Sequence, residues 1–246
     1  MQTSQAVQVL ILGASYGSLL ASKLLMAGHD ATLVCRPTNA ALINAEGIRT
    51  RMPVKGLSAP VEVDSRRLGG RVSAASPDDI ALERYQLVVL AMQEPQYAAP
   101  DVKALMQRIA AARLPCLSLM NMPPLPYLAR IAGIDVAACR SSYTDPAVWD
   151  GFEPGSIALC SPDPQAVRPA GQPSNVLEVR LPTNFKSAPF GRPEHTALLQ
   201  RLEAEIEAAR YDAGQGPLEL PVKLKVHDNL YVPLAKWSML MAGNYR

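Results

Sequence analysis

The sequence predicts an α/β protein with a Rossmann-type, doubly wound and mostly parallel sheet, followed by the start of an α-helical C-terminal domain. The first observation is a buried strand over residues 7–12 that passes through a glycine turn into a helix. The second is another apolar strand directly after that helix, over residues 31–36. The third is the continued alternation of strand and helix as far as residue 120, which is typical of an open sheet covered by helices.

The N-terminal elements follow from local signals. In the first helix, over residues 17–27, apolar residues repeat at helical spacing, and Gly28 ends it. A shorter helix is predicted over residues 40–45. Residues 48–51 and 59–63 alternate in polarity on either side of a glycine, which is typical of two exposed strands.

Two later strands are predicted to be fully buried. Residues 86–91 and 116–120 are continuous apolar runs, as the central strands of a parallel sheet are. A helix over residues 102–112 connects them. The proline-rich residues 121–126 then interrupt regular structure.

The chain beyond residue 131 is punctuated by prolines, and its predicted elements are more irregular. Residues 176–181 alternate in polarity, which indicates an antiparallel strand. Residues 194–211 have an apolar stripe at helical spacing and predict an amphipathic helix. A last helix is predicted over residues 228–246, with an Asp228 cap at its start.

The composition argues against several classes of function. The formal net charge of +2 is too small to indicate a nucleic-acid or membrane partner, and aromatic residues, at 5%, are too few for a base-stacking surface. No apolar run approaches the roughly 18 to 20 residues that span a bilayer. The N-terminus has no basic segment before an apolar core. We therefore expect a cytoplasmic protein.

The spacing of cysteine and histidine argues against a metal site. The four cysteines form no CxxC pair, and none of the three histidines has a second ligand at helical spacing. We therefore expect no bound metal.

The glycine turn predicts an anion site. Gly13 and Gly17 enclose Ala14, Ser15 and Tyr16, and the helix begins at Gly17. Backbone N–H groups and the positive end of the helix would face the phosphates of a dinucleotide there. The alternative is a turn that serves only the close packing of strand and helix.

Four further residues fall where ligands bind in such folds, at the carboxyl ends of strands. Arg36 ends the second strand, where an NAD-binding unit usually has an acid, so it favours the 2′-phosphate of NADP over a plain surface role. Met92 and Gln93 follow the fourth strand, and Asn121 follows the fifth. Packing for Met92 and loop capping for Asn121 stay open as alternatives.

With these features together, the chain resembles the ketopantoate reductase family over residues 7–128 and again in the C-terminal helix. The shared features are the glycine turn, the Gly28-His29 pair, Arg36, the Leu42 to Gly47 segment and Asn121. The resemblance implies a Rossmann-type domain and a helical domain that reduce a small 2-keto acid with NADPH. By position it matches the general-acid lysine of the family to Lys236 and a family asparagine to Asn244. A lysine that only extends to solvent from an apolar helix is the alternative for Lys236.

The chain also departs from the family pattern. Ala14 or Ser15 replaces the middle glycine of the turn, and Met92 replaces a lysine that family members usually carry. Met122 replaces the glycine after Asn121, and Leu240 replaces an asparagine one turn after Lys236. These departures favour a divergent member with a substrate bulkier or more apolar than ketopantoate.

We assign residues 1–225 to one Rossmann-type NADP-binding domain, with residues 131–225 as its irregular second half. Residues 226–246 are assigned to the first helix of a truncated C-terminal substrate domain. Because that helix stops in mid-pattern, we expect the chain to be the N-terminal portion of a longer protein.

The predicted function is that of an NADP-dependent oxidoreductase acting on a small 2-keto acid or related carbonyl. In this hypothesis Lys236, Asn121 and Asn244 are catalytic, with the ketone carbon held between Lys236 and Asn121. An opine-type dehydrogenase that reduces an imine, and a dinucleotide-binding module without catalysis, stay open as alternatives. A homodimer also stays open.

Overall fold

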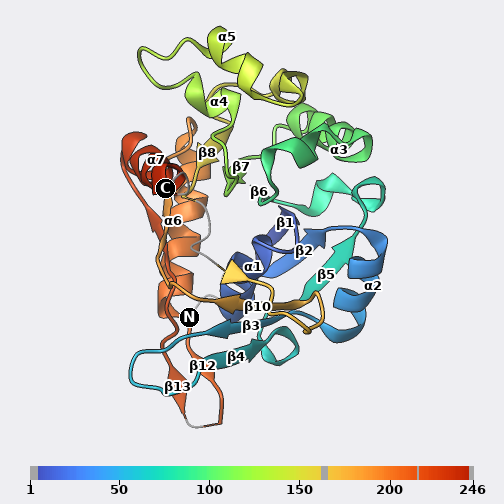
Figure 1. Cartoon of the computed structure of the whole chain (residues 1–246), viewed down its shortest axis with the longest axis vertical. Coiled ribbons are helices and arrows are strands. Elements are labelled where there is room, and N and C mark those ends of the chain that lie inside the picture. The colour runs from blue at the N-terminus through green and yellow to red at the C-terminus, as the bar shows by residue number, and fades with distance from the viewer. Residues whose placement is uncertain (1–4, 162–165, 215, 244–246) are drawn as a thin grey trace.

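The computed structural model describes residues 5–161, 166–214 and 216–243, and its centre is a parallel sheet (Figure 1). Six strands within these ranges follow the order β5-β2-β1-β6-β7-β8, and all are parallel. They are β1 (Gln8–Leu12), β2 (Asp30–Val34), β5 (Val72–Ala75), β6 (Leu87–Leu90), β7 (Cys116–Ser118) and β8 (Ile157–Leu159). In chain order this is the 3-2-1-4-5-6 arrangement of a doubly wound Rossmann fold, so the predicted fold class is confirmed.

Helices cover both faces of this sheet, and alternate side chains of β1 point to the two sides. Val9 and Ile11 belong to a core that includes residues of α1 and α6, whereas Leu10 and Leu12 belong to a core that includes residues of α3 and α4. The α-helices are α1 (Gly17–Met26), α2 (Pro37–Glu46), α3 (Pro100–Ala111), α4 (Leu125–Leu128), α5 (Val136–Cys139), α6 (Pro193–Ala208) and α7 (Tyr231–Gly243). Short 3-10 helices are η1 (Ser65–Arg67), η2 (Pro77–Asp79), η3 (Leu82–Arg84), η4 (Glu94–Ala98), η5 (Arg140–Ser142) and η6 (Pro146–Trp149).

A second sheet joins chain segments that are far apart in sequence. Its order is β4-β3-β10-β9, with β10 parallel to β3 and the other two pairs antiparallel. Its strands are β3 (Arg49–Met52), β4 (Val61–Asp64), β9 (Ala166–Val167) and β10 (Val176–Val179). Two small pairs complete the strands, with β11 (Phe185–Ser187) parallel to β14 (Leu224–Val226) and β12 (Tyr211–Asp212) antiparallel to β13 (Pro217–Leu218).

The structure corrects several predicted elements of the second half. Residues 156–160, expected to be part of an irregular region, supply β8, the sixth strand of the central sheet. The helix predicted over residues 194–211 ends at Ala208, because Tyr211 pairs with Leu218 in a hairpin. The last helix begins at Tyr231, and its cap is Asn229 rather than Asp228.

No helix in the described parts of the chain combines the length and the apolar character needed to cross a membrane. The division into residues 1–225 and 226–246 stays a prediction.

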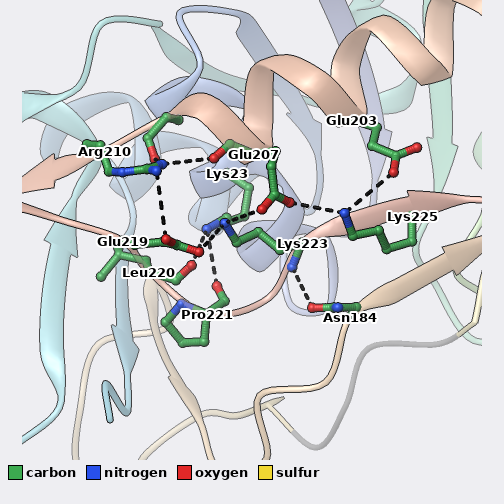
Figure 2. A network of polar contacts seen from close by, with 11 residues as sticks. Lys23, Asn184, Glu203, Glu207, Arg210, Glu219, Leu220, Pro221, Lys223 and Lys225 are labelled. Atoms are coloured by element: carbon green, nitrogen blue, oxygen red, sulfur yellow. Dashed lines mark hydrogen bonds and ion pairs between the residues drawn. The ribbon is translucent and has the colours of Figure 1, made fainter. Parts of the chain in front are cut away.

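The first helix buries a lysine against a distant part of the chain (Figure 2). Lys23 in α1 is 2% exposed, and its Nζ donates to the carbonyl oxygens of Leu220 and Pro221 at 3.2 and 3.1 Å. The next residue, Val222, has a φ of 65°, which is an uncommon conformation for a β-branched side chain. Burial, and next the charge of Lys223, lower the pKa of Lys23 from 10.5 to about 8.

Ion pairs surround this buried ammonium. Lys223 contacts Glu207 of α6 at 3.2 Å and Glu219 at 2.7 Å, and Arg210 contacts Glu219 at 3.7 Å (Figure 2). The acids balance the charge of two lysines that lie close together. The hydrogen bonds of Lys23 therefore connect α1 to the segment between α6 and β14. The helix α1 is the one that follows the glycine turn.

We predict that a Lys23→Met variant differs from the wild type in the pH dependence of its free energy of unfolding. At pH values between the lowered pKa of Lys23 and its ordinary pKa, the unfolded chain binds a proton that the folded protein does not. The free energy of unfolding of the wild type therefore rises with pH in this range. From pH 7.5 to 9.5 the wild type should gain about 2 kcal/mol relative to the variant. Urea unfolding at several pH values measures this, with Lys55→Met as the exposed control. A constant difference across this range would contradict the prediction.

Candidate functional site

A cleft lies at the carboxyl edge of the central sheet, between the glycine turn and the ends of β2 and β6. Its volume is about 610 Å³. The predicted site residues that line it are Gly13, Ala14, Ser15, Tyr16, Arg36, Met92 and Gln93. Cys35, Asn39, Gln96 and Arg168 line it as well and were not predicted. A cavity of about 450 Å³ adjoins the cleft and extends toward Pro77 and Val102.

The glycine turn packs directly on the end of β6. Gly13 has a φ of 111°, and a Cβ at this position would lie 2.6 Å from the carbonyl oxygen of Ala91. A Cβ on Gly17 would lie 2.3 Å from Cγ2 of Ile11, so this glycine allows α1 to lie close to β1. Both glycines therefore allow close packing of the turn and helix. Gly13 also lines the cleft, whereas Gly17 does not.

The same turn presents backbone donors to the cleft. The Gly13 N–H donates to Val34 at 3.0 Å and the Gly17 N–H to Gly13 at 3.1 Å, so both are occupied. The N–H groups of Ala14, Ser15 and Tyr16 have no acceptor among the described residues. Three unpaired N–H groups at the start of a helix are a suitable site for an anion.

Of the two residues that could replace the middle glycine, Ala14 is largely buried. It lines the cleft, but it is only 8% exposed and belongs to the core on the α1 side, so its methyl group packs mainly inside the protein. The hydroxyl of Ser18 donates to the Ala14 carbonyl, which keeps this turn in place before α1 begins.

Two arginines face the cleft from different parts of the chain. Arg36 precedes α2 at the end of β2, and Arg168 follows β9. Both are exposed, and within the described ranges neither guanidinium has a hydrogen bond or an ion pair. Burial raises the pKa of the Cys35 thiol, while the charges of Arg168 and Arg36 act to lower it. Both positive charges therefore act at the end of β2.

The loop after β6 is held by its own side chains. The Met92 N–H donates to the Tyr97 hydroxyl at 3.3 Å, and the Gln93 N–H donates to Oε1 of Gln96 at 2.9 Å. Cγ of Met92 lies 2.8 Å from the position that a Cβ on Gly13 would take. Met92 therefore packs over the glycine turn and adds no charge to the cleft.

Asn121 connects three segments at the end of β7. Its Oδ1 accepts from the Glu94 N–H at 2.9 Å, and its carbonyl oxygen accepts from Nε1 of Trp237 in α7 at 2.8 Å. The side chain therefore caps a loop, as the alternative interpretation held, although the loop is the one after β6. Asn121 does not line the cleft, and its contact with cofactor or substrate stays a prediction.

Lys236 is hydrogen-bonded to the protein. Its Nζ donates to Oγ of Ser161 at 3.2 Å, to Oγ1 of Thr183 at 3.3 Å and to the carbonyl oxygen of Asn184 at 2.8 Å. These contacts connect α7 to the segments after β8 and before β11. The catalytic role of Lys236 stays a prediction, and Asn244 lies outside the described residues.

We predict that Gly13→Ala destabilises the protein more than Gly56→Ala. Both glycines have positive φ, but a Cβ on Gly56 meets nothing within 4 Å, whereas a Cβ on Gly13 meets the backbone of Ala91. Gly56→Ala should lower the free energy of unfolding by about 1 kcal/mol and Gly13→Ala by at least about 3 kcal/mol. Chemical denaturation measures both, and equal losses would contradict the proposed close approach.

Comparison with known proteins establishes the fold. No protein-family model and no curated protein matches the sequence. Among solved structures, 2-dehydropantoate 2-reductase from Methylococcus capsulatus is 15% identical, with a TM-score of 0.58 over 96% of this chain and 61% of that chain. A PanE/ApbA family ketopantoate reductase from Ralstonia eutropha JMP134 is 20% identical, with a TM-score of 0.56 over 96% of this chain and 60% of that chain.

A third similar structure is a ternary complex of D-mandelate dehydrogenase with NADH and anilino(oxo)acetate. It is 15% identical, with a TM-score of 0.54 over 92% of this chain and 58% of that chain. The chain therefore spans about 60% of the length of these proteins. The resemblance to ketopantoate reductases is confirmed at the level of the fold.

Proposed function

We propose that the protein binds NADP(H) in the cleft at the carboxyl edge of the sheet and acts as an oxidoreductase on a small carbonyl substrate. The observation that carries the proposal is the convergence of three unpaired backbone N–H groups and two unpaired arginines, among the described residues, on one cleft. The cleft also lies beside β1, where the order of strands reverses and where such sheets bind ligands.

The residues of the cleft fit the parts of this cofactor. The N–H groups of Ala14, Ser15 and Tyr16 would hold the pyrophosphate, and Arg36 would hold the 2′-phosphate. The adjoining cavity, with Pro37 and Pro77 in its lining, would accept the adenine. When bound, the nicotinamide supplies the hydride that reduces a carbonyl or an imine.

For the substrate we propose a 2-keto acid with a bulky or apolar group. This rests on the similarity to the solved ketopantoate reductases and to D-mandelate dehydrogenase, whose structure is a complex with NADH and anilino(oxo)acetate. A hollow of about 350 Å³ between the loop after β7 and α7 supports an apolar group, because Met122, Leu234 and Trp237 line it. Lys236 would protonate the substrate oxygen, and Asn121 and Asn244 would orient the substrate.

A dinucleotide-binding module without catalysis is the second candidate. The hydrogen bonds of Lys236 to Ser161, Thr183 and Asn184 favour it, because they give the ammonium a structural role. The two candidates share the cofactor site and differ only in turnover.

We predict that Arg36→Ala weakens NADPH binding by roughly tenfold or more and leaves NADH binding nearly unchanged, because only NADPH has the 2′-phosphate. Fluorescence titration of each dinucleotide measures the two Kd values. A wild-type protein whose melting temperature rises with neither dinucleotide would contradict the proposed function. Equal losses for both dinucleotides would contradict the role of Arg36.

We predict that Lys236→Met lowers kcat at least about 100-fold on a panel of aliphatic and aromatic 2-keto acids, because a positioned general acid contributes at least that much. Lys236→Arg keeps the positive charge. This variant therefore distinguishes the loss of proton transfer from the loss of the hydrogen bonds to Ser161 and Asn184. The Kd for NADPH and the melting temperature are measured for all three proteins. A lower melting temperature with unchanged kcat would make Lys236 a structural residue only.

A further inference from the structure

We propose that Arg168 is a second phosphate-binding residue and that, with Arg36, it binds the 2′-phosphate of NADP(H). The proposal rests on the proposed function, because it adds a specificity-determining residue to the same site. Arg168 belongs to a segment that the resemblance to ketopantoate reductases did not include, and no local sequence signal marks it.

The second sheet brings Arg168 to the cleft. β9 immediately precedes it and pairs with β10, where Val167 lies opposite Glu178. β10 in turn pairs with β3, and β3 follows α2, whose first turn begins next to Arg36. Strand pairing therefore places two arginines from distant parts of the chain at one cleft.

The chain that follows Arg168 is fastened to α2 and to its C-terminal end. The Ser174 hydroxyl hydrogen-bonds to Oδ1 of Asn39 at 2.9 Å, and Asn39 itself lines the cleft. Nδ2 of Asn175 donates to the Gly47 carbonyl at 2.9 Å, and Asn175 is 3% exposed. These bonds limit the distance that the segment can move from Arg36.

The charges of the cleft support an anion with two negative charges. In the part of the chain that the structure describes, Arg36 and Arg168 have no acidic partner, and Met92 adds no cation. Among the described residues no acid lines the cleft itself, and Asp78 and Asp101 line the adjoining cavity instead. Two guanidinium groups without partners repel each other, and a phosphate monoester between them removes that repulsion and accepts several hydrogen bonds.

The test uses ligands that differ in the 2′-phosphate. Arg168→Ala should weaken binding of 2′,5′-ADP and NADPH by roughly tenfold, and leave binding of 5′-AMP and NADH within about twofold. Arg168→Lys should lie between the two, because it keeps the charge and loses the planar fork. Arg180→Ala removes the same charge from an exposed position after β10 and should change none of the four Kd values.

The outcomes separate this proposal from the proposed function. If the wild type binds NADPH and 2′,5′-ADP and Arg168→Ala binds them equally well, Arg168 has no role at the phosphate and the present proposal fails alone. A loss of the same size for 5′-AMP and NADH would also overturn it, because the effect would then not belong to the 2′-phosphate. If the wild type binds neither NADPH nor 2′,5′-ADP, the proposed function itself fails.

Discussion

The arrangement of the site depends on the contact between the glycine turn and the end of β6. Because Gly13 has no side chain, the turn can lie against the carbonyl group of Ala91. Because Gly17 has none, α1 can lie against Ile11 of β1. Between these two contacts lie Ala14, Ser15 and Tyr16, which line the cleft and whose N–H groups have no acceptor among the described residues. The two contacts place the turn beside Met92, so the ends of β1 and β6 form one wall of the cleft. A larger residue at Gly13 would separate these two strands where the ligand is proposed to bind.

The second half of the chain completes this site rather than following it as a separate unit. It supplies β8 to the central sheet and β9 and β10 to the second sheet. It also supplies the carbonyl groups that accept hydrogen bonds from Lys23, so the segment around Leu220 helps to hold α1 in place. An ammonium that loses its water on burial needs such acceptors, which makes this contact specific to one arrangement of the chain.

The parts of the fold and site that could be predicted from the sequence are those with local causes. Gly13 and Gly17 mark a turn, and Arg36 follows a strand directly, so their places could be inferred from neighbouring residues. Arg168 could not be inferred, because strand pairing with β10 brings it to the cleft and the sequence around it has no periodic signal. β8 could not be inferred for a similar reason: a strand of three residues among prolines has no clear local signal, and it is defined by its pairing at the edge of the sheet.

The two steps of the proposed function depend on different parts of the molecule. Cofactor binding would depend on the cleft, which is lined by both arginines and by the residues whose N–H groups have no acceptor among the described residues. In this proposal reduction would depend on α7, which Trp237 connects to the loop after β7 and which Lys236 connects to Ser161 and Asn184. Proton donation from Lys236 would require a substrate oxygen to replace one of these acceptors. A substrate that offers a carboxylate as well as a carbonyl could compete for the ammonium, because a hydrogen bond between opposite charges is stronger than one to a neutral oxygen. This favours a keto acid over a neutral ketone.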